Sequence, residues 1–443
     1  MHLRVEAGTA EIAGHAFTVP QRIDWEAGDI VYLDAASSER PSLFLELLSG
    51  LARFSRYLQP VEGRAMVRRP FPVRGLDLFS FRLPDGSSFK LTLPDEECPA
   101  GLDFRLHRAQ TIGFVFGEPK QYSVGRNVAE EIRYSFAALG REVPSDLSAF
   151  DTYGLTKILA HPTQSLSGGE SHRLNIACVV ETGSPFLILD LSAANLDRDF
   201  KAFLKTLLNE IRETRIVLIY DGGRGDFADL CRRAVTISAG RVATVEVASV
   251  REACASRAPL LLTDPAREGA EPILVAEGFG HAGLARPFSA LLREGEHALF
   301  LAPNGTGKTS LARGLVGIDA RHDGRLWRRE GSRIAAIFQY PDRLPVHLTV
   351  GELDRGGAFR DHFPEVGRDV RVAELPLSRK KLLYVLAFLA MPLDILVLDE
   401  PFAGLDRPEM EILLAQINAA TGLSAMIFSH EAEIDAETVR HLI

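Results

Sequence analysis

Apolar, β-rich runs alternate along the chain with longer stretches that have helical periodicity. Four clear runs in the second half are 297–302, 335–339, 395–400 and 425–430. Strands that alternate with helices in this way are typical of a mostly parallel sheet with helices on both faces. The pattern therefore predicts an α/β fold.

The longest apolar stretch, at 382–398, has 17 residues and contains Pro392 and Asp394. A helix that spans a membrane needs about 20 apolar residues. The proline and the aspartate instead predict a buried helix, a turn and a buried strand. We expect no membrane-spanning segment in the chain.

Five segments occur twice, in the same order, in the two halves of the chain. The clearest pair is LILDLSAANLD at 187–197 and LVLDEPFAGLD at 396–406. The shared order predicts two homologous domains, at 1–248 and 272–443, joined by a linker at 249–271. The other pairs are 26–51 with 293–318, 116–119 with 338–341, 166–177 with 377–388, and 216–221 with 425–430.

The composition excludes several classes of protein. The chain has 443 residues, of which 50 are Lys or Arg and 59 are Asp or Glu, so its formal net charge is −9. An acidic chain is a poor candidate for general binding to nucleic acid. The four cysteines are widely spaced, which argues against a zinc site or a disulfide framework and fits a reducing, cytoplasmic compartment.

A glycine-rich segment, LAPNGTGKTS at 301–310, follows a predicted strand and precedes a predicted helix. In this setting, glycines let backbone N–H groups surround phosphate oxygens, and the helix N-terminus adds a favourable dipole. Lys308 is expected to reach the β- and γ-phosphates, and the Thr309 hydroxyl is expected to bind Mg²⁺. A plain glycine-rich turn is the alternative, because Ala302 stands where the strict pattern has Gly. The residues predicted to bind the nucleotide here are Asn304, Gly305, Thr306, Gly307, Lys308, Thr309 and Ser310.

An acidic pair lies 91 residues after Lys308, where the run 395–400 ends in Asp399 and Glu400. A carboxylate at the end of a strand suits Mg²⁺, so Asp399 is predicted to bind the metal. Glu400 is predicted to act as a general base on the attacking water, an effect of about 10²–10⁴ in rate. The alternative is a strand end with two solvated acids.

These motifs resemble those of the ATP-binding cassette (ABC) family of ATPases, and the resemblance covers nearly the whole chain. It implies two tandem P-loop NTPase domains, each with a mostly parallel sheet and a helical subdomain, that bind ATP and Mg²⁺. By their positions in the family's motifs, Gln339 would join the metal and the attacking water, and His430 would contact the γ-phosphate during catalysis. Phe279 would stack on adenine.

The signature sequence of the same family stands in the other half, as Leu166-Ser167-Gly168-Gly169-Glu170. Ser167 is expected to cap a helix, and the two glycines are expected to expose backbone N–H groups to the γ-phosphate. The residues Ser167, Gly168, Gly169 and Glu170 are therefore predicted to form the second part of the nucleotide site.

Each half has lost what the other half keeps. The differing positions are Pro41 against Lys308, Leu191 against Glu400, Asp221 against His430, and Gly168 and Gly169 against Arg379 and Lys380. ABC domains pair head to tail, and each site takes the P-loop of one partner and the signature of the other. The resemblance therefore implies an intramolecular head-to-tail pseudo-dimer, with one complete ATP site and one chain per ATPase pair.

Two further motifs, FQYPD at 338–342 and VGEL at 350–353, resemble those of energy-coupling-factor (ECF) importer ATPases. We predict the ATP-hydrolysing subunit of an ECF-type transporter for a vitamin or metal ion, held at the cytoplasmic face of the membrane by transmembrane partner subunits. No nucleic-acid partner is expected. The alternatives are a soluble ABC ATPase acting on a macromolecular machine and a scaffold that binds ATP without turnover.

Overall fold

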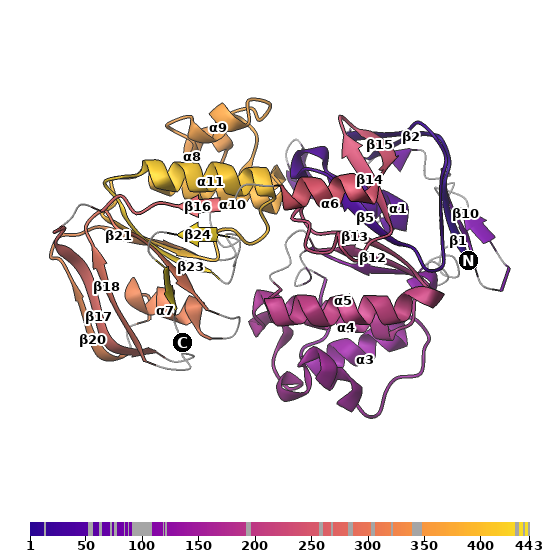
Figure 1. Ribbon diagram of the computed structural model, residues 1–443, viewed down its shortest axis with the longest axis horizontal. Helices are drawn as coiled ribbons and strands as arrows, with labels where there is room; N and C mark the ends of the chain where they lie inside the picture. Colours follow the sequence, from indigo (N-terminus) through magenta and orange to yellow (C-terminus); the bar gives the residue numbers. More distant parts are fainter. Residues whose placement is uncertain are drawn as a thin grey trace. The chain divides into compact units, whose positions relative to one another are not determined.

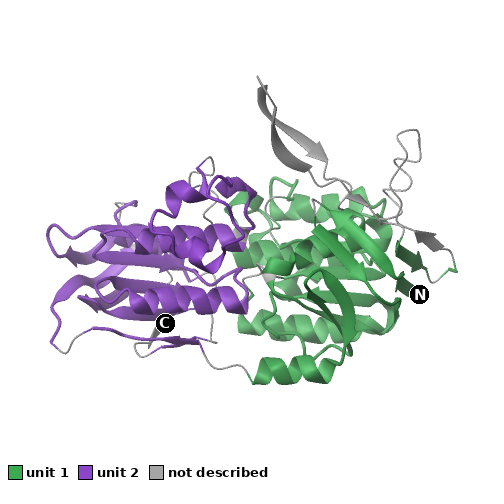
Figure 2. Cartoon of the chain, turned by 90° about the horizontal axis from the view of Figure 1, so that it is seen from above, with its two compact units in different colours: residues 1–257 green, residues 258–443 purple. Residues whose placement is uncertain are grey.

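The computed structural model of the chain divides into two compact units, Met1–Arg257 and Ala258–Ile443 (Figure 2). The residues that the structure describes are 1–12, 15–51, 56–61, 64–70, 73–74, 78–83, 85–86, 88–90, 109–117, 119, 122–191, 196–256, 260–266, 269–281, 287–302, 306–319, 322–338, 348–429, 434–436 and 439–441. Among them, no helix is both long enough and apolar enough to cross a bilayer.

A nine-stranded sheet forms the centre of the first unit (Figure 1). Five of its strands are parallel, and the other four continue the sheet beyond β14. In spatial order the parallel strands are β11 (Ile112–Val115), β12 (Phe186–Asp190), β13 (Ile216–Tyr220), β5 (Ile30–Asp34) and β14 (Arg233–Ser238). The others are β15 (Arg241–Val245), β3 (His15–Val19), β2 (Gly8–Ile12) and β8 (Val73–Arg74).

Helices cover both faces of this sheet because alternate residues of each strand point to opposite sides. On β5, Val31 packs in one core with Phe44 of α1 (Pro41–Ser49), and Tyr32 packs in the other core with Leu174 of α4 (Gly168–Glu181). Figure 1 shows α4 along one side of β12 and β13 together with α5 (Arg198–Ile211).

The second unit contains a five-stranded sheet in which every strand is parallel to its neighbours. In spatial order the strands are β21 (Ile334–Ile337), β22 (Ile395–Asp399), β23 (Ser424–Ser429), β19 (His297–Leu301) and β25 (Val439–His441). The order is that of β11, β12, β13, β5 and β14 in the first unit. The two units therefore repeat one α/β fold, and the predicted fold class is confirmed.

An antiparallel sheet accompanies each parallel one. It has the order β10-β9-β1-β4 in the first unit and β18-β17-β20 in the second. The strands are β10 (Ser88–Lys90), β9 (Phe79–Arg82), β1 (His2–Val5), β4 (Ile23–Glu26), β18 (Phe288–Arg293), β17 (Pro272–His281) and β20 (His322–Arg328). A separate hairpin joins β6 (Arg56–Val61) to β7 (Arg64–Pro70).

The remaining elements connect these sheets. The helices are α3 (Val128–Ala138), α6 (Val247–Ala255), α7 (Lys308–Leu315), α8 (Val350–Leu353), α9 (Ala358–His362), α10 (Leu377–Leu389) and α11 (Arg407–Ala419). Short 3₁₀ helices are η1 (Ser37–Glu39), η5 (Ser148–Tyr153), η6 (Thr156–Ile158), η7 (Thr163–Ser165), η8 (Arg212–Thr214) and η10 (Val372–Glu374).

The longest apolar stretch folds as expected, into the buried helix α10, a turn and the buried strand β22. The segment 249–271 contains more order than a linker requires. It includes most of α6 and the strand β16 (Leu260–Leu262), which pairs with β24 (Ile434–Ala436) of the second unit. The division between the units falls inside this segment.

Candidate functional site

Parallel strands of the second unit end at one edge of their sheet, and the predicted phosphate and metal residues follow them there. β19 leads through 302–307 into α7, which begins at Lys308, and the neighbouring strand β22 ends at Asp399. Gly307 before α7 has a φ of 94°, a left-handed conformation that glycine adopts without strain. The fold therefore brings Lys308 and Asp399 to the same edge.

The Lys308 ammonium is buried between two acceptors. Its Nζ donates to the Ala302 carbonyl at 2.8 Å and lies 2.9 Å from Oε1 of Glu400. A buried charge is tolerated only when it is paired and hydrogen-bonded. Lys308 was predicted to pair with phosphate, and in this structure the Glu400 carboxylate supplies the negative charge that pairs with it. A phosphate group that binds Lys308 would therefore compete with this carboxylate.

Asp399 lies at the end of β22, within reach of α7. The Thr309 hydroxyl donates to Oδ2 of Asp399 at 2.5 Å. The other oxygen, Oδ1, is buried and accepts no hydrogen bond from the described residues. Burial raises the pKa of Asp399 to about 6; the negative charge of Glu400 adds to this rise, while the hydrogen bond from Thr309 and the charges of Lys308 and Lys381 oppose it.

These groups fit a nucleotide with Mg²⁺. Asp399 has a buried oxygen with no donor among the described residues, and the Thr309 hydroxyl lies beside it, so both offer oxygens of the kind that Mg²⁺ prefers. Lys308 offers a buried cation at the start of a helix. When bound, Mg²⁺ would neutralise part of the phosphate charge. Thr309 and Asp399 would hold it, and Lys308 would hold the phosphates.

Asp399→Asn is expected to stabilise the nucleotide-free protein at pH 8 by up to about 3 kcal/mol. The pKa of Asp399 is about 6 in the folded state against an ordinary 3.8, so the folded state binds the extra proton between these values. Stability therefore falls as the pH rises through this window, and the whole penalty is present above it. Urea denaturation without Mg²⁺ at pH 4 to 8 measures the difference.

The control for this measurement is Asp369→Asn, at an exposed aspartate of the same unit. We expect the control to match the wild type at every pH. An Asp399→Asn protein that is no more stable than the wild type at pH 8, or whose advantage persists at pH 4, would contradict the burial argument.

Phe279 does not have the predicted role. It lies on β17, is 0% exposed, and packs in a core that includes Phe288 of the neighbouring strand. Its ring centroid lies 4.7 Å from that of His322. An aromatic ring with no exposed face cannot stack on a base, so the prediction that Phe279 contacts adenine is wrong. The alternation of β17 turns this side chain inward, which a motif spacing does not reveal.

Four predicted site residues, Asn304, Gly305, Gln339 and His430, lie outside the described residues. Their roles stay predictions.

The signature segment of the first unit forms the start of α4. Ser167 is its N-cap: the Ser167 hydroxyl accepts from the Glu170 N–H at 3.3 Å, and the Glu170 carboxylate accepts from the Ser167 N–H at 2.7 Å. Gly168 and Gly169 are the first two helical residues, whose N–H groups have no carbonyl partner within the helix. The Glu170 side chain completes the capping box in this structure, and its contact with the nucleotide stays a prediction.

The matching segment of the second unit is filled by its own charges. The Ser378 hydroxyl and Nε of Arg379 donate to the Glu409 carboxylate at 3.0 and 3.1 Å, and all three residues are buried. The Arg379 guanidinium also lies 3.4 Å from the ring centroid of Phe363. These contacts pair the Arg379 charge within the unit and link the start of α10 to α11.

Two residues that contact Glu400, Lys381 and Ser429, were not predicted from the sequence. Nζ of Lys381 donates to the carbonyls of Glu400 and Ala403 at 2.8 and 2.7 Å, and the Ser429 hydroxyl donates to Oε2 of Glu400 at 3.4 Å. A lysine inside the otherwise apolar segment 381–389 was the available signal for Lys381.

Known proteins resemble the chain over one unit or over both. No family model matches it. The aliphatic sulfonates import ATP-binding protein SsuB of Granulibacter bethesdensis is 32% identical over 175 residues, which cover 36% of this chain and 72% of that protein. A putative ABC transporter ATP-binding protein of Methanosarcina acetivorans is 24% identical over 75% of this chain and 72% of its own.

The chain belongs to the ABC ATPase family. Enzymes of this family hydrolyse ATP, so the predicted enzyme class is confirmed together with the fold. This ABC ATPase spans 63–76% of the lengths of four curated relatives. A solved structure, a model of ribosome-bound archaeal Pelota and ABCE1, shares the fold with a TM-score of 0.65 and 14% identity, over 97% of this chain and 73% of that one.

The first unit of the ABC ATPase keeps the backbone of a phosphate-binding turn without its chemistry. Arg40, at the position of Gly307, has a φ of 55°, and α1 begins at Pro41 as α7 begins at Lys308. A left-handed conformation costs a residue other than glycine about 1–2 kcal/mol. Proline has neither an N–H group nor a charge, so this turn has lost the donors that phosphate requires.

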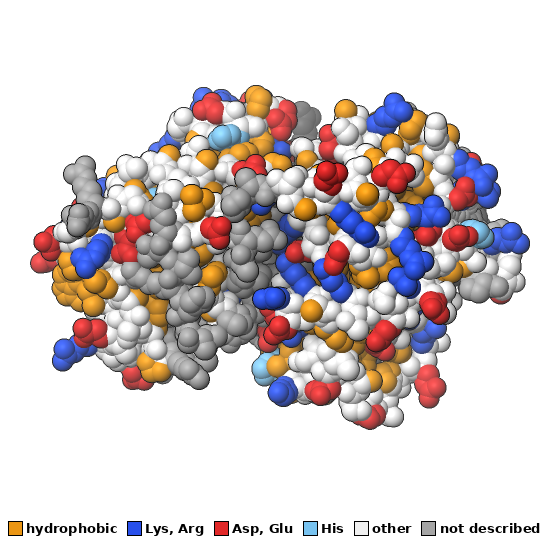
Figure 3. Space-filling view, viewed as in Figure 1, with side chains coloured by type: hydrophobic (Ala, Val, Ile, Leu, Met, Phe, Trp, Pro, Cys, Tyr) orange, Lys and Arg blue, Asp and Glu red, His pale blue; other side chains and the backbone are white. Residues whose placement is uncertain are grey.

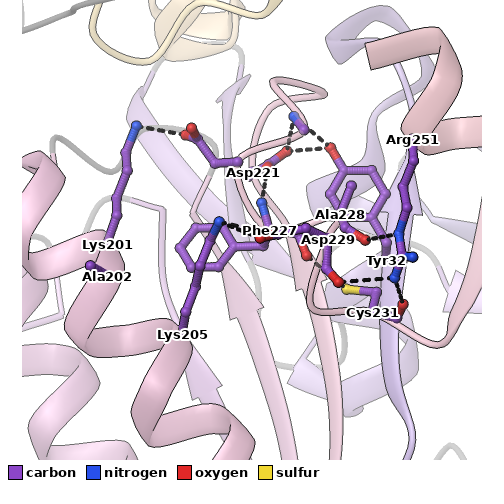
Figure 4. Close-up of polar contacts among 12 residues, drawn as sticks. Tyr32, Lys201, Ala202, Lys205, Asp221, Phe227, Ala228, Asp229, Cys231 and Arg251 are labelled. Atoms are coloured by element: carbon purple, nitrogen blue, oxygen red, sulfur yellow. Dashed lines mark hydrogen bonds and ion pairs between the residues drawn. The ribbon is translucent and has the colours of Figure 1, made fainter. Parts of the chain in front are cut away.

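Asp221 is an anchor for its own loop (Figure 4). Its Oδ1 accepts from the Tyr32 hydroxyl at 2.6 Å and from the Arg224 N–H at 3.1 Å, and its Oδ2 accepts from the Phe227 N–H at 3.3 Å. Burial and the nearby Asp226 charge raise the pKa of Asp221, whereas these hydrogen bonds favour the carboxylate. An aspartate surrounded by donors from its own unit is a structural group.

The strand pairing also corrects the position to which Asp221 corresponds. Asp190 pairs with Tyr220, and its equivalent Asp399 pairs with Phe428, so Tyr220 and Phe428 are equivalent positions. The residues that follow them, Asp221 and Ser429, are therefore equivalent as well. The sequence comparison matched Asp221 with His430, 209 positions later, and the strand pairing shortens this separation by one residue. By the same count along the sequence Gly222 corresponds to His430, and glycine has no side chain that could contact phosphate.

Lys and Arg side chains gather on the face of the first unit in Figure 3, with Asp and Glu side chains among them. Elsewhere in the described part of this unit, ion pairs join Lys201 to Asp226 at 2.6 Å and Lys205 to Asp229 at 2.8 Å.

Proposed function

We propose that this ABC ATPase hydrolyses ATP at one composite site and drives a membrane transporter. The complete part of the site in the second unit is Lys308, Thr309, Asp399 and Glu400, with Gln339 and His430 expected to join it. The part from the first unit is the start of α4 at Ser167, Gly168 and Gly169. In this proposal the two units pair head to tail within one chain.

The observation that supports a single site is that the losses are complementary. The second unit keeps a buried lysine, a threonine and two carboxylates at its sheet edge, and fills its own signature segment with Arg379. The first unit keeps the glycine start of α4, and has Pro41 in place of the lysine. Independent decay of two sites would not spare the matching parts of one.

The groups of the chain divide the work as follows. When ATP binds, Lys308 would exchange the Glu400 carboxylate for phosphate. Glu400 would then be available to accept a proton from the attacking water. The N–H groups of Gly168 and Gly169 would stabilise charge that develops on the γ-phosphate. The Ser429 hydroxyl, at the end of β23, donates to Oε2 of Glu400 at 3.4 Å and would help to hold the carboxylate in place.

A transporter role is supported by the surface next to α3 in the first unit. Tyr122 and Val124 are 51% and 78% exposed. The Phe116 ring stacks on that of Tyr122 with centroids 3.8 Å apart. Beside them is a cavity of about 260 Å³ lined by Phe116, Tyr122, Leu174 and Cys178 among others. Exposed apolar side chains beside a cavity are typical of a surface that receives another protein.

The finer proposal is an ECF-type importer for a vitamin or metal ion, with transmembrane partner subunits that hold the chain at the cytoplasmic face. The motifs at 338–342 and 350–353 support the ECF type, and the name of the SsuB relative supports import. The net charge of −9 supports the expectation that nucleic acid is not the partner.

Co-purification from solubilised membranes tests the transport proposal. The tagged full chain is expected to recover small integral membrane proteins, and a Tyr122→Asp, Val124→Asp double variant is expected to lose them because two charges enter an apolar contact. A Glu142→Gln variant, at an exposed residue just beyond α3, is the control and is expected to retain them.

Recovery of ribosomes or DNA without any membrane protein would contradict transport and favour the soluble ATPase on a macromolecular machine. A purified chain that binds ATP but shows no turnover with any recovered partner would favour the scaffold.

A further inference from the structure

Lys381 contacts the backbone of the loop that carries Glu400. It is on the second turn of α10, is 2% exposed, and donates from one ammonium group to the carbonyls of Glu400 and Ala403. Both distances, 2.8 and 2.7 Å, are those of strong charge-assisted hydrogen bonds. The two acceptors are three residues apart, so one side chain joins both ends of the turn 400–403 after β22.

The backbone of Glu400 needs such support. Glu400 has a φ of 51°, in the left-handed region, although it is not a glycine. Residues in such conformations cost about 1–3 kcal/mol and persist only where their surroundings hold them. Hydrogen bonds hold this backbone in the structure: the Phe428 carbonyl accepts from the Glu400 N–H at 2.8 Å, and the Glu400 carbonyl accepts from the Ala403 N–H at 3.3 Å and from Lys381 at 2.8 Å.

The first unit provides a comparison within the same chain. Leu191 is the equivalent of Glu400, and its N–H donates to the Tyr220 carbonyl at 2.7 Å, as in the second unit. Glu170 stands at the position of Lys381 and cannot donate to a carbonyl. Leu191 is not among the residues with positive φ. The left-handed conformation is therefore found where the lysine is present, and not where it is absent.

The first turn of α10 reaches the far end of the same loop. Arg379 and Ser378 bind the Glu409 carboxylate, and Glu409 forms a capping box with Asp406 at the start of α11. The segment 400–406 is thus attached to α10 at both ends. The substitutions that removed the signature from this unit also supply the side chains that hold this loop.

We infer that Lys381 is a positioning residue for the general base: by binding the Glu400 and Ala403 carbonyls it fixes the left-handed backbone that aims the Glu400 carboxylate. The inference rests on the proposed role of Glu400 in hydrolysis. The hydrogen bonds from Lys381 go to the backbone carbonyls of Glu400 and Ala403, so it acts on the reaction through the peptide of Glu400. Its loss should therefore slow turnover without weakening nucleotide binding.

The test compares Lys381→Met with Lys380→Met in the full chain. Lys380 is the neighbouring lysine, only partly buried and outside this hydrogen-bond network. For Lys381→Met we expect kcat to fall at least about tenfold, since misplacing a reacting group by about 1 Å can cost about 10². The Kd for a fluorescent ATP analogue should stay within about threefold of the wild type. Lys380→Met should match the wild type in both.

A second variant covers the case in which Lys381→Met does not fold. Lys381→Gln keeps N–H donors but loses the positive charge that strengthens these hydrogen bonds, so its kcat is expected to fall at least about threefold below the wild type and to stay above that of Lys381→Met. Hydrogen exchange at 400–405 should be faster in both variants than in Lys380→Met.

A kcat within twofold of the wild type in a folded Lys381→Met or Lys381→Gln protein would overturn the inference, and so would equal losses of kcat and nucleotide affinity, which a merely structural role predicts. Failure of the proposed function looks different: the wild type would then show no turnover, and Glu400→Gln would not differ from it.

Discussion

Gly168→Asp is expected to lower ATP turnover at least about 100-fold, although Gly168 lies in the unit that has no phosphate-binding lysine. It is the first residue of α4, where backbone N–H groups have no partner within the helix. An aspartate there would attract those N–H groups and repel a γ-phosphate. Removing one hydrogen-bond donor from a site that stabilises developing charge typically lowers kcat about 10²–10³-fold, and we expect a loss of that size here. Phosphate release under saturating ATP measures it.

The fold should survive this change, because a carboxylate in the first turn of a helix is favourable. Gly168 has no positive φ, so a side chain brings no backbone strain. The control is Lys380→Asp, which places the same new charge at the start of α10, in the segment that corresponds to the signature. We expect full activity from the control. Normal turnover in Gly168→Asp would refute the composite site.

Glu400→Gln is expected to lower kcat by about 10²–10⁴ while ATP binds at least as tightly as to the wild type. The first effect follows from the loss of the general base. The second follows from the contact between Glu400 and Lys308, 2.9 Å apart and buried, which bound phosphate must replace. A neutral amide holds the ammonium less strongly, so ATP has less to displace. Steady-state kinetics and the Kd of a fluorescent ATP analogue separate the two effects.

The matched control is Glu330→Gln, at an exposed glutamate of the same unit, and it should change neither quantity. Weaker ATP binding in Glu400→Gln would show that the pair with Lys308 does not compete with phosphate. Unchanged kcat would remove Glu400 from the reaction.

The elements around the site could be predicted because local sequence determines them. The apolar stretch that becomes α10 and β22 contains a proline and an aspartate at its turn, and the glycine-rich segment before Lys308 marks the start of α7. Lys308, Thr309, Asp399 and Glu400 could be predicted for the same reason, since each stands at a strand or helix end.

Side-chain environments could not be predicted in the same way. Phe279 has a motif-like position, yet the alternation of β17 buries it. Lys381 follows the two cations that replace the signature glycines, yet its ammonium donates to the carbonyls of a turn about 20 positions later in the chain. Such contacts depend on how α10 packs beside the end of β22, which no local pattern contains.

The sequence by itself determined the α/β class, the repeat of one fold and the residues able to handle phosphate and Mg²⁺, because periodicity and motif order are local properties. The tertiary structure alone decided the partner of each buried charge: Lys308 pairs with Glu400, Arg379 pairs with Glu409, and Asp221 accepts a hydrogen bond from the Tyr32 hydroxyl. It also moved the equivalent of Asp221 from His430 to Ser429. The physical reason is that a buried charge takes the nearest available partner in space, and distance along the chain does not set distance in space.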